Sequence, residues 1–309
     1  MNKKIKLASV ILTGTMIIAG LSGCAKNQNT QPGGNANTGN KKIGIVLSTL
    51  NNPFFVSMKD GAEKRAKELG YELIVVDSGD DAAKERSNVE DMVQKGVGAL
   101  IINPTDSDAV VNAIKVANDA KIPVLTVDRA ANGGTIVSHI ASDNVKGGEM
   151  AAQFILEKLN GKANIVELQG IPGASATRDR GKGFHNGVDG KADVKVVASQ
   201  AADFDRTKGL NVMENIIQST PTFDAVFAHN DEMALGAAKA IKTANKKVLI
   251  VGFDGNEDAK AAVKSGDMAA TIAQQPDLMG SMAVDNAVKV IGGQTIEKQI
   301  AAELQLITK

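Results

Sequence analysis

The chain has 309 residues, with 35 Lys and Arg against 35 Asp and Glu, so its formal net charge is zero. This balance provides no basic field for nucleic acid, and we expect no nucleic-acid partner. Without the amino-terminal segment that holds Lys3, Lys4 and Lys6, 32 basic residues remain against 35 acidic ones, which is weakly acidic. The single Cys excludes an intramolecular disulfide, so the fold must depend on its apolar core.

Residues 1–23 have the layout of a secretory signal. A basic start, MNKKIK, precedes an apolar run over 7–20 that is too short for a comfortable membrane span. Ser22 and Gly23 then precede Cys24, which resembles the lipobox at which bacterial lipoproteins are cleaved and lipidated. A lone Cys can also be a small buried hydrophobe, but this one lies outside any segment with a folding pattern. We therefore expect a lipid on Cys24 to anchor the mature chain to a membrane.

The chain after Cys24 divides into a tether and a folded part. Residues 24–40 lack apolar periodicity and are rich in Asn, Gly, Gln and Thr, which predicts a flexible tether. From residue 41 onward, short runs rich in Val and Ile alternate with helical patterns. We expect strands over 42–48, 71–78, 98–104, 122–128, 137–143, 163–170, 194–200, 223–231 and 247–255.

Helical patterns lie between these runs, and the clearest cover 54–70, 150–161 and 232–245. Gly70 ends the first of them as a C-cap. Strands that are apolar almost throughout and alternate with helices predict an α/β fold, in which helices cover both faces of parallel sheets.

The two halves of this pattern echo each other and predict two doubly wound lobes. Asn103 and Asp128 lie at the ends of consecutive expected strands, 25 residues apart. Asn230 and Asp254 repeat the arrangement at a spacing of 24 residues. Because ligands of open α/β sheets bind at the carboxyl ends of the strands, two such edges facing each other predict a cleft lined with amides and carboxylates.

The segment NNPFF, Asn51–Phe55, allows two interpretations. The chain has eight Phe, one Tyr and no Trp, so two adjacent rings at a strand end need a reason. They either pack the first turn of a helix on the sheet or offer a stacking surface to a ligand, and the spacing alone does not choose between these.

The charged residues favour a polar cleft. Asp128–Arg129 could be an ordinary ion pair at a strand end, but Arg180 and Asp254 would add a second cation and a second anion. Carboxylate, amide and guanidinium groups suit sugar hydroxyls, which donate and accept at fixed angles. Aromatic rings suit the C–H faces of a sugar, which gives NNPFF a role at the ligand.

Signals for catalysis are weak. The sequence contains no GxSxG elbow, no GxxxxGK[ST] loop and no GxGxxG after the first strand. His139, His185 and His229 are scattered without metal-ligand spacing, so we expect no metal and no cofactor. Asp128 and Asp254 could be imagined as a glycosidase pair, but each has a better partner among arginines and hydroxyl groups. We expect a binding protein without catalytic residues.

Several segments carry a specific resemblance. They are VLSTLNNPFFVSMKDGAEKRAKELGY, INPTDSDAVVNAIK, PVLTVDR, VSHIASDN, ELQGIPG, ADFDRTKGLNVM, AHNDEMALGA, VGFDG and ATIAQQPD. Together they resemble the bacterial ribose-binding proteins, which are the substrate-binding components of ribose ABC importers in the type I periplasmic binding protein family. The resemblance extends over 41–309.

The resemblance implies two lobes that are joined by three crossing strands and close on a sugar. The amino-terminal lobe would comprise 41–142 plus 275–302, and the carboxy-terminal lobe 143–274 plus 303–309. The crossings are expected near Ser142, near Gln274 and in the carboxy-terminal strand. The implied ligand is D-ribose, with allose or galactose as the alternative. The implied partner is an ABC permease, and we expect a monomer.

Ligand contacts follow from matching motifs. They are Asn52, Phe54, Phe55, Asp128, Arg129, Arg180, Phe204, Asn230, Asp254 and Gln274. More peripheral positions of the pocket are Asn103, Ser142, Ile171 and Phe253. Departures from the family pattern, at Pro172 and His229, are expected at the rim. The lipobox departs from periplasmic relatives and implies a Gram-positive cell, with the protein on the outer face of the cell membrane.

Two other classes remain as hypotheses. The effector core of a LacI-type transcription regulator resembles the same fold, but it would need a helix-turn-helix where this chain has its signal-like segment. A sugar-modifying enzyme would change ribose chemically, whereas a binding protein would return it unchanged.

Overall fold

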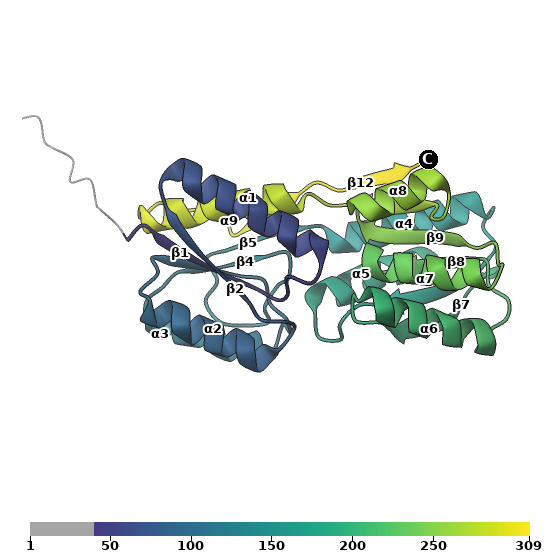
Figure 1. Cartoon of the computed structure of the whole chain (residues 1–309), viewed down its shortest axis with the longest axis horizontal. Helices are drawn as coiled ribbons and strands as arrows, with labels where there is room; N and C mark the ends of the chain where they lie inside the picture. Colours follow the sequence, from purple (N-terminus) through teal and green to yellow (C-terminus); the bar gives the residue numbers. More distant parts are fainter. Residues whose placement is uncertain (1–39) are drawn as a thin grey trace, which may run out of the picture. The chain divides into compact units, whose positions relative to one another are not determined.

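The computed structural model describes residues 40–309 (Figure 1). The expected signal, the lipidation site Cys24 and the tether as far as residue 39 lie outside the described residues. Within the described part, two six-stranded sheets belong to one compact unit.

The first sheet is parallel throughout and has the strand order β11-β5-β4-β3-β1-β2. Its strands are β1 (Lys42–Leu47), β2 (Glu72–Asp77), β3 (Ala99–Ile102), β4 (Val124–Val127), β5 (Ser138–Ser142) and β11 (Gln299–Ala302). One face is covered by α1 (Pro53–Leu69) and α9 (Pro276–Ile291). The other face is covered by α2 (Ala82–Gln94) and α3 (Val110–Asp119). We call this sheet with its helices the N-lobe.

The second sheet has the order β12-β10-β9-β8-β6-β7, and only β12 runs antiparallel to its neighbour. Its strands are β6 (Ala163–Gln169), β7 (Val194–Ala201), β8 (Ala225–Ala228), β9 (Leu249–Asp254), β10 (Ala270–Ala273) and β12 (Gln305–Thr308). One face packs on α4 (Asn144–Lys158) and α5 (Ser175–Val188). The other packs on α6 (Arg206–Ser219), α7 (Asp231–Thr243) and α8 (Glu257–Ser265). We call this assembly the C-lobe. The predicted α/β class, with helices on both faces of each sheet, is confirmed.

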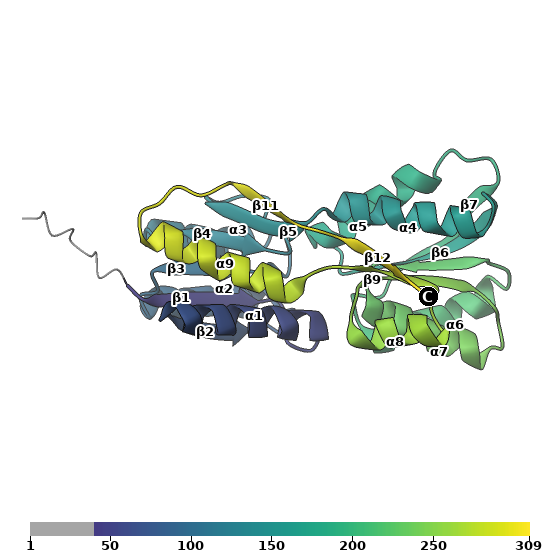
Figure 2. The same cartoon turned by 90° about the horizontal axis from the view of Figure 1, so that it is seen from above.

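The chain passes between the two sheets three times. It leaves the N-lobe between β5 and α4, returns between β10 and α9, and leaves again between β11 and β12. Figure 2 shows the last of these crossings as the yellow segment that runs from β11 to β12.

Local capping explains where the helices begin and end. The side chain of Asp81 accepts a hydrogen bond from Lys84 N at the start of α2, so the acidic run 77–81 is a helix start. Gly70 ends α1 in the left-handed region, as expected. Asp143 caps α4 through Lys146 N, which starts that helix six residues before the apolar pattern begins at residue 150.

Glycines let α1 and α9 approach each other closely. A Cβ on Gly61 would lie 2.1 Å from Asp277 O, and a Cβ on Gly280 would lie 2.1 Å from Met58 O. These obstacles are backbone atoms, so a side chain could be accommodated only by moving a helix. The helix pair, together with the N-lobe core beneath it, therefore depends on glycine at both positions.

Gly280→Ala should destabilise the protein, because the added methyl forces α9 away from α1. We expect the free energy of unfolding to fall by about 1–3 kcal/mol in urea titrations. Gly292→Ala is the matched control at the end of the same helix, where the nearest atom to a Cβ is Lys289 O at 3.4 Å. That variant should stay within about 1 kcal/mol of wild type. Equal stability of the two variants would contradict the close helix contact.

Candidate functional site

Four charged side chains are buried where the carboxyl ends of strands from the two lobes meet. Asp128, Arg129, Arg180 and Asp254 are only 3–4% exposed. They line one common cavity. The remaining residues around it are Asn52, Phe54, Phe55, Ala176, Phe204 and Asn230. Nine of the ten expected ligand contacts therefore surround a single space, and two cations face two anions there.

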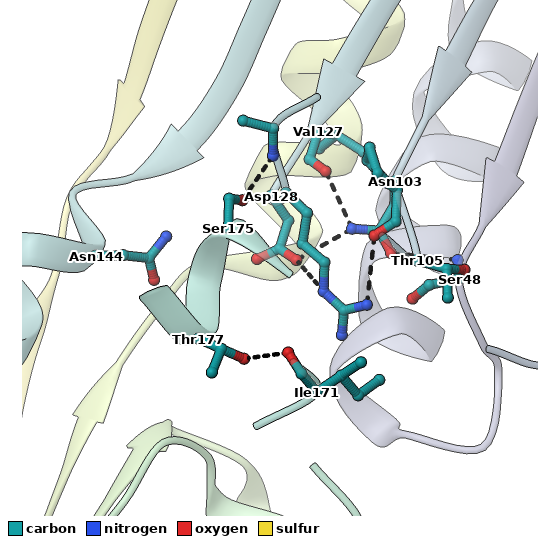
Figure 3. A network of polar contacts seen from close by, with 12 residues as sticks. Ser48, Asn103, Thr105, Val127, Asp128, Asn144, Ile171, Ser175 and Thr177 are labelled. Atoms are coloured by element: carbon teal, nitrogen blue, oxygen red, sulfur yellow. Dashed lines mark hydrogen bonds and ion pairs between the residues drawn. The ribbon is translucent and has the colours of Figure 1, made fainter. Parts of the chain in front are cut away.

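The N-lobe contributes the Asp128–Arg129 pair from the end of β4 (Figure 3). The amide of Asn103 donates to Asp128 Oδ2 and to Val127 O, both at 3.1 Å. Arg129 Nη1 donates to Pro104 O at 3.4 Å, and its Nε lies 3.8 Å from Asp128 Oδ2. Among residues 40–309, neither Asp128 Oδ1 nor Arg129 Nε has a hydrogen-bond partner. These two buried polar atoms can serve a ligand.

The C-lobe contributes Arg180 from α5 and Asp254 from the end of β9. Arg180 Nη1 donates to Asp254 Oδ1 at 3.4 Å and to the carbonyl of His229 at 2.5 Å. Its Nε donates to Asn144 Oδ1 at 2.8 Å. The guanidinium carbon lies 3.9 Å from the ring centroid of Phe253, a geometry in which the ring stabilises the cation. Phe253 thus supports Arg180 from the C-lobe core instead of lining the cavity.

Burial is the main influence on the pKa of Asp254 in the C-lobe half of the site. It raises the pKa of Asp254 to about 7, although Arg180 and the amide of Gln274, which donates at 2.9 Å, both act in the opposite direction. Gln274 reaches the site only through this hydrogen bond and does not line the cavity. A ligand hydroxyl donating to Asp254 would stabilise the carboxylate and lower its pKa.

The two aspartates of the cavity, Asp128 and Asp254, have positive backbone φ angles. Asp128 has a φ of 62° and Asp254 a φ of 121°, and residues with side chains rarely adopt such values. Each costs roughly 1–3 kcal/mol of strain, which the surrounding structure must offset. Strain of this kind clusters at binding sites, because it directs a side chain where regular strand geometry would not.

The rings of NNPFF lie both in the start of a helix and on the cavity wall. Phe54 and Phe55 lie in the first turn of α1, belong to the N-lobe core and also line the cavity. Their centroids are 5.2 Å apart in an edge-to-face arrangement. Arg129 lies 5.2 Å from the ring centroid of Phe55 and 5.1 Å from that of Phe204 in the C-lobe. Phe204 can lie there because residue 170 is Gly, whose Cβ would otherwise approach the ring to 2.0 Å.

Two asparagines of the cavity wall are helix caps. Asn52 Oδ1 accepts from Phe54 N at 2.9 Å, and Asn230 Oδ1 accepts from Met233 N at 2.9 Å. The amide of Asn230 also donates to Phe204 O at 3.1 Å. Their side-chain oxygens are thus already engaged, which leaves mainly amide N–H groups for a ligand.

The peripheral positions are dispersed. Asn103 lies behind Asp128, as described. Ser142 lines a different hollow, at the end of β5, and Ile171 lies in the loop before α5. Neither of these two reaches the cavity wall. Ala176, which does line the cavity, is not among the predicted residues, because a small apolar residue carries no chemical signal in the sequence.

The prediction that His229 lies at the rim is wrong. The side chain is fully buried, and its Nε2 lies 2.9 Å from Glu167 Oε1. Burial lowers the pKa of His229, so the ring is neutral near pH 7 and donates from Nε2. The Glu167 pKa would rise through burial, but hydrogen bonds from His229 and Ser199 outweigh this effect and bring it to about 2. Glu167 thereby fixes the residue whose carbonyl holds Arg180.

No metal site is visible in the described part of the chain, where no three His, Cys, Asp or Glu side chains gather in a suitable way. Within residues 40–309, no helix has the length and apolar character needed to cross a membrane.

Glu167→Gln should make the protein less stable and less dependent on pH. The folded pKa of about 2 is below the ordinary 4.5, so the stabilisation is complete above about pH 5 and is lost as the pH falls through 2. At pH 7 we expect a loss of about 1–3 kcal/mol in urea unfolding, and a flatter profile between about pH 5 and 2. The exposed Glu157→Gln is the control. A Glu167→Gln profile parallel to wild type would contradict this role.

Comparisons with known proteins agree with the fold and the site. The sequence model for the periplasmic binding protein domain matches residues 43–295. The ribose import binding protein of Bacillus subtilis strain 168 is 52% identical over 307 residues, covering 98% of this chain and 99% of its own. The ribose import binding protein of Escherichia coli K12 is 54% identical over 268 residues, or 86% and 90% of the two chains.

A solved structure extends the comparison. The solute binding protein of an ABC transporter from Actinobacillus succinogenes, with bound D-allose, superposes with a TM-score of 0.82 at 33% identity. The match covers 87% of this chain and 97% of that one. From the matched domain, the identities and the shared architecture, the chain belongs to the periplasmic binding protein family.

Proposed function

We propose that this protein captures D-ribose between its two lobes and delivers it to an ABC-type sugar permease. The observation that carries the proposal is the shared cavity, to which the N-lobe contributes Asp128–Arg129 and the C-lobe contributes Arg180–Asp254. The ribose import binding proteins that resemble the chain over most of its length support the same ligand.

The charge balance of the cavity favours a neutral polyol. A ligand hydroxyl that donates to Asp254 keeps this residue ionised, although burial raises its pKa to about 7. Two carboxylates and two guanidinium groups then compensate one another, so a charged ligand would leave a net charge buried at a cost of several kcal/mol. Sugar hydroxyls can donate to Asp128 Oδ1 and accept from Arg129 Nε, the two atoms that lack other partners in the described structure. Each hydroxyl would then meet a charged group of fixed direction.

The rings favour a pentose. Phe54, Phe55 and Phe204 all line the cavity, and the extra hydroxymethyl group of a hexose would meet them. Allose is the strongest alternative, because it shares the hydroxyl stereochemistry of ribose through most of the ring and is bound in the solved relative. Galactose is a weaker one.

Delivery without chemistry fits the site. Asp254 is paired with Arg180, and Asp128 lies beside Arg129, so both carboxylates are placed to hold hydroxyls. We infer that the protein is not an enzyme and that bound ribose is released unchanged. Closure on the sugar would present one combined surface of the two lobes to the permease, and we expect the protein to act as a monomer.

We further infer that the protein works outside the cytoplasm, held on the cell membrane by a lipid on Cys24. Support comes from the lipobox-like LSGC and from the family, whose members named above include binding proteins of importers. Because the anchor implies that no outer membrane is needed to retain the protein, we expect a Gram-positive type of cell.

Ribose selectivity tests the proposed function. Titration calorimetry should give micromolar or tighter binding of ribose. Arabinose and xylose should bind roughly ten- to several-hundredfold more weakly, because an epimer leaves a buried charged group without its partner. Glucose and galactose should hardly bind. If allose or galactose displaces ribose at equal concentration, the pentose assignment is wrong although the sugar-binding role stands; if no sugar binds, the proposed function fails.

Cys24→Ala should release the protein from the membrane into the medium, since a single lipid is the expected anchor. Fractionation of cells that produce the full chain, followed by immunoblotting, measures the distribution. Thr30→Ala, in the expected tether, leaves the lipobox-like segment and the cysteine unchanged and serves as the control. Unchanged membrane retention of Cys24→Ala would refute the lipid anchor.

A further inference from the structure

Outside the three chain crossings, the direct hydrogen bonds between the lobes of the described structure gather at one edge. Ala130 N donates to Ser175 Oγ at 2.8 Å, and Ser107 N donates to Gly173 O at 3.1 Å. Arg178 of the C-lobe adds longer contacts of 3.4 Å to Ser107 Oγ and to Asn132 Oδ1.

Ser175 accepts the shortest of these hydrogen bonds. It is 4% exposed and is the first residue of α5, the helix that also carries Ala176 and Arg180. Its partner, Ala130, directly follows Asp128 and Arg129. One hydrogen bond thus joins the backbone that bears the N-lobe charged pair to the helix that bears the C-lobe guanidinium (Figure 3).

The loop before α5 is held by hydrogen bonds of its own. Thr177 Oγ1 donates to Ile171 O at 2.8 Å, and Ala174 N donates to the same carbonyl at 3.2 Å. Both bonds lie within the C-lobe, so they fix the loop irrespective of the N-lobe. The backbone that carries Ser175 is therefore already ordered when it meets Ala130 N, which lowers the entropic cost of the contact.

We propose that Ser175 is a positioning residue for the sugar site, whose hydroxyl fixes the spacing between the Asp128–Arg129 and Arg180–Asp254 pairs when the lobes meet. This proposal rests on the proposed function as far as ribose is concerned. Ser175 does not line the cavity, so it acts on a ligand only through the residues it positions. If the Ser175 hydroxyl is removed, Ala130 N loses its acceptor, and the segment that follows the strained Asp128 is less constrained. The Asp128–Arg129 and Arg180–Asp254 pairs can then move apart.

The first measurement does not involve a ligand. Amide hydrogen exchange followed by NMR should show a protected Ala130 N–H in the wild-type protein and at least tenfold faster exchange in Ser175→Ala. Ser175→Thr keeps a hydroxyl and should restore protection. Ser219→Ala, which removes an exposed hydroxyl at the end of α6, should leave Ala130 unchanged. Equal exchange rates of Ala130 in wild type and Ser175→Ala would overturn the contact.

The second measurement is ribose calorimetry on the same variants. Ser175→Ala should bind ribose about three- to tenfold more weakly, with an unfolding midpoint in urea close to wild type, and Ser175→Thr should recover most of the affinity. Wild-type affinity in Ser175→Ala would refute the positioning role. A wild-type protein that binds no ribose would refute the proposed function, while the exchange data would still decide whether Ser175 ties the lobes together.

Discussion

The rest of the structure depends on the mutual compensation of four buried charges. An unpaired charge in such a place costs several kcal/mol, so Asp128, Arg129, Arg180 and Asp254 must lie close together and be held by further polar groups. Strand ends of two sheets provide that proximity, because parallel strands bring their carboxyl ends to one edge. The positive φ values of Asp128 and Asp254 direct their carboxylates toward this edge. The ring of Phe253 helps to stabilise the buried Arg180 guanidinium there.

The two lobes solve this problem differently, although their sequences echo each other. In the N-lobe, Asn103 donates directly to Asp128, as the parallel placement indicates. In the C-lobe, the corresponding Asn230 caps α7, and Gln274 beyond the next strand supplies the amide for Asp254. In the C-lobe, a buried His229–Glu167 pair fixes the carbonyl that receives Arg180. In the N-lobe, the buried Glu85 accepts a hydrogen bond from Thr105 N, which directly follows the Pro104 carbonyl that receives Arg129. Asn103 and Asn230 thus occupy equivalent positions in the two lobes but make different hydrogen bonds.

Patterns and motifs predicted most of the fold and of the candidate site, and the exceptions have physical reasons. The nine expected strands are present, because buried parallel strands are apolar over their whole length. The pattern did not single out β10 (ATIA) and β11 (QIAA), because each has a single Ile and otherwise Ala, Thr or Gln, and so lacks a run of Val, Ile or Leu. Motifs indicated the charged residues and the rings, whereas the burial of His229 depends on Glu167, 62 residues away. Ser175 escaped notice because its partner lies on the other lobe.

The crystal structure of the protein with ribose tests the central claim most directly. The account predicts one ribose in the cavity between the lobes, with hydroxyls within about 3 Å of polar atoms of Asp128, Arg129, Arg180 and Asp254. It also predicts Phe54 and Phe204 against the faces of the sugar ring. A ribose bound elsewhere, or one whose hydroxyls meet mainly water while the four charged groups stay paired only with one another, would contradict the account.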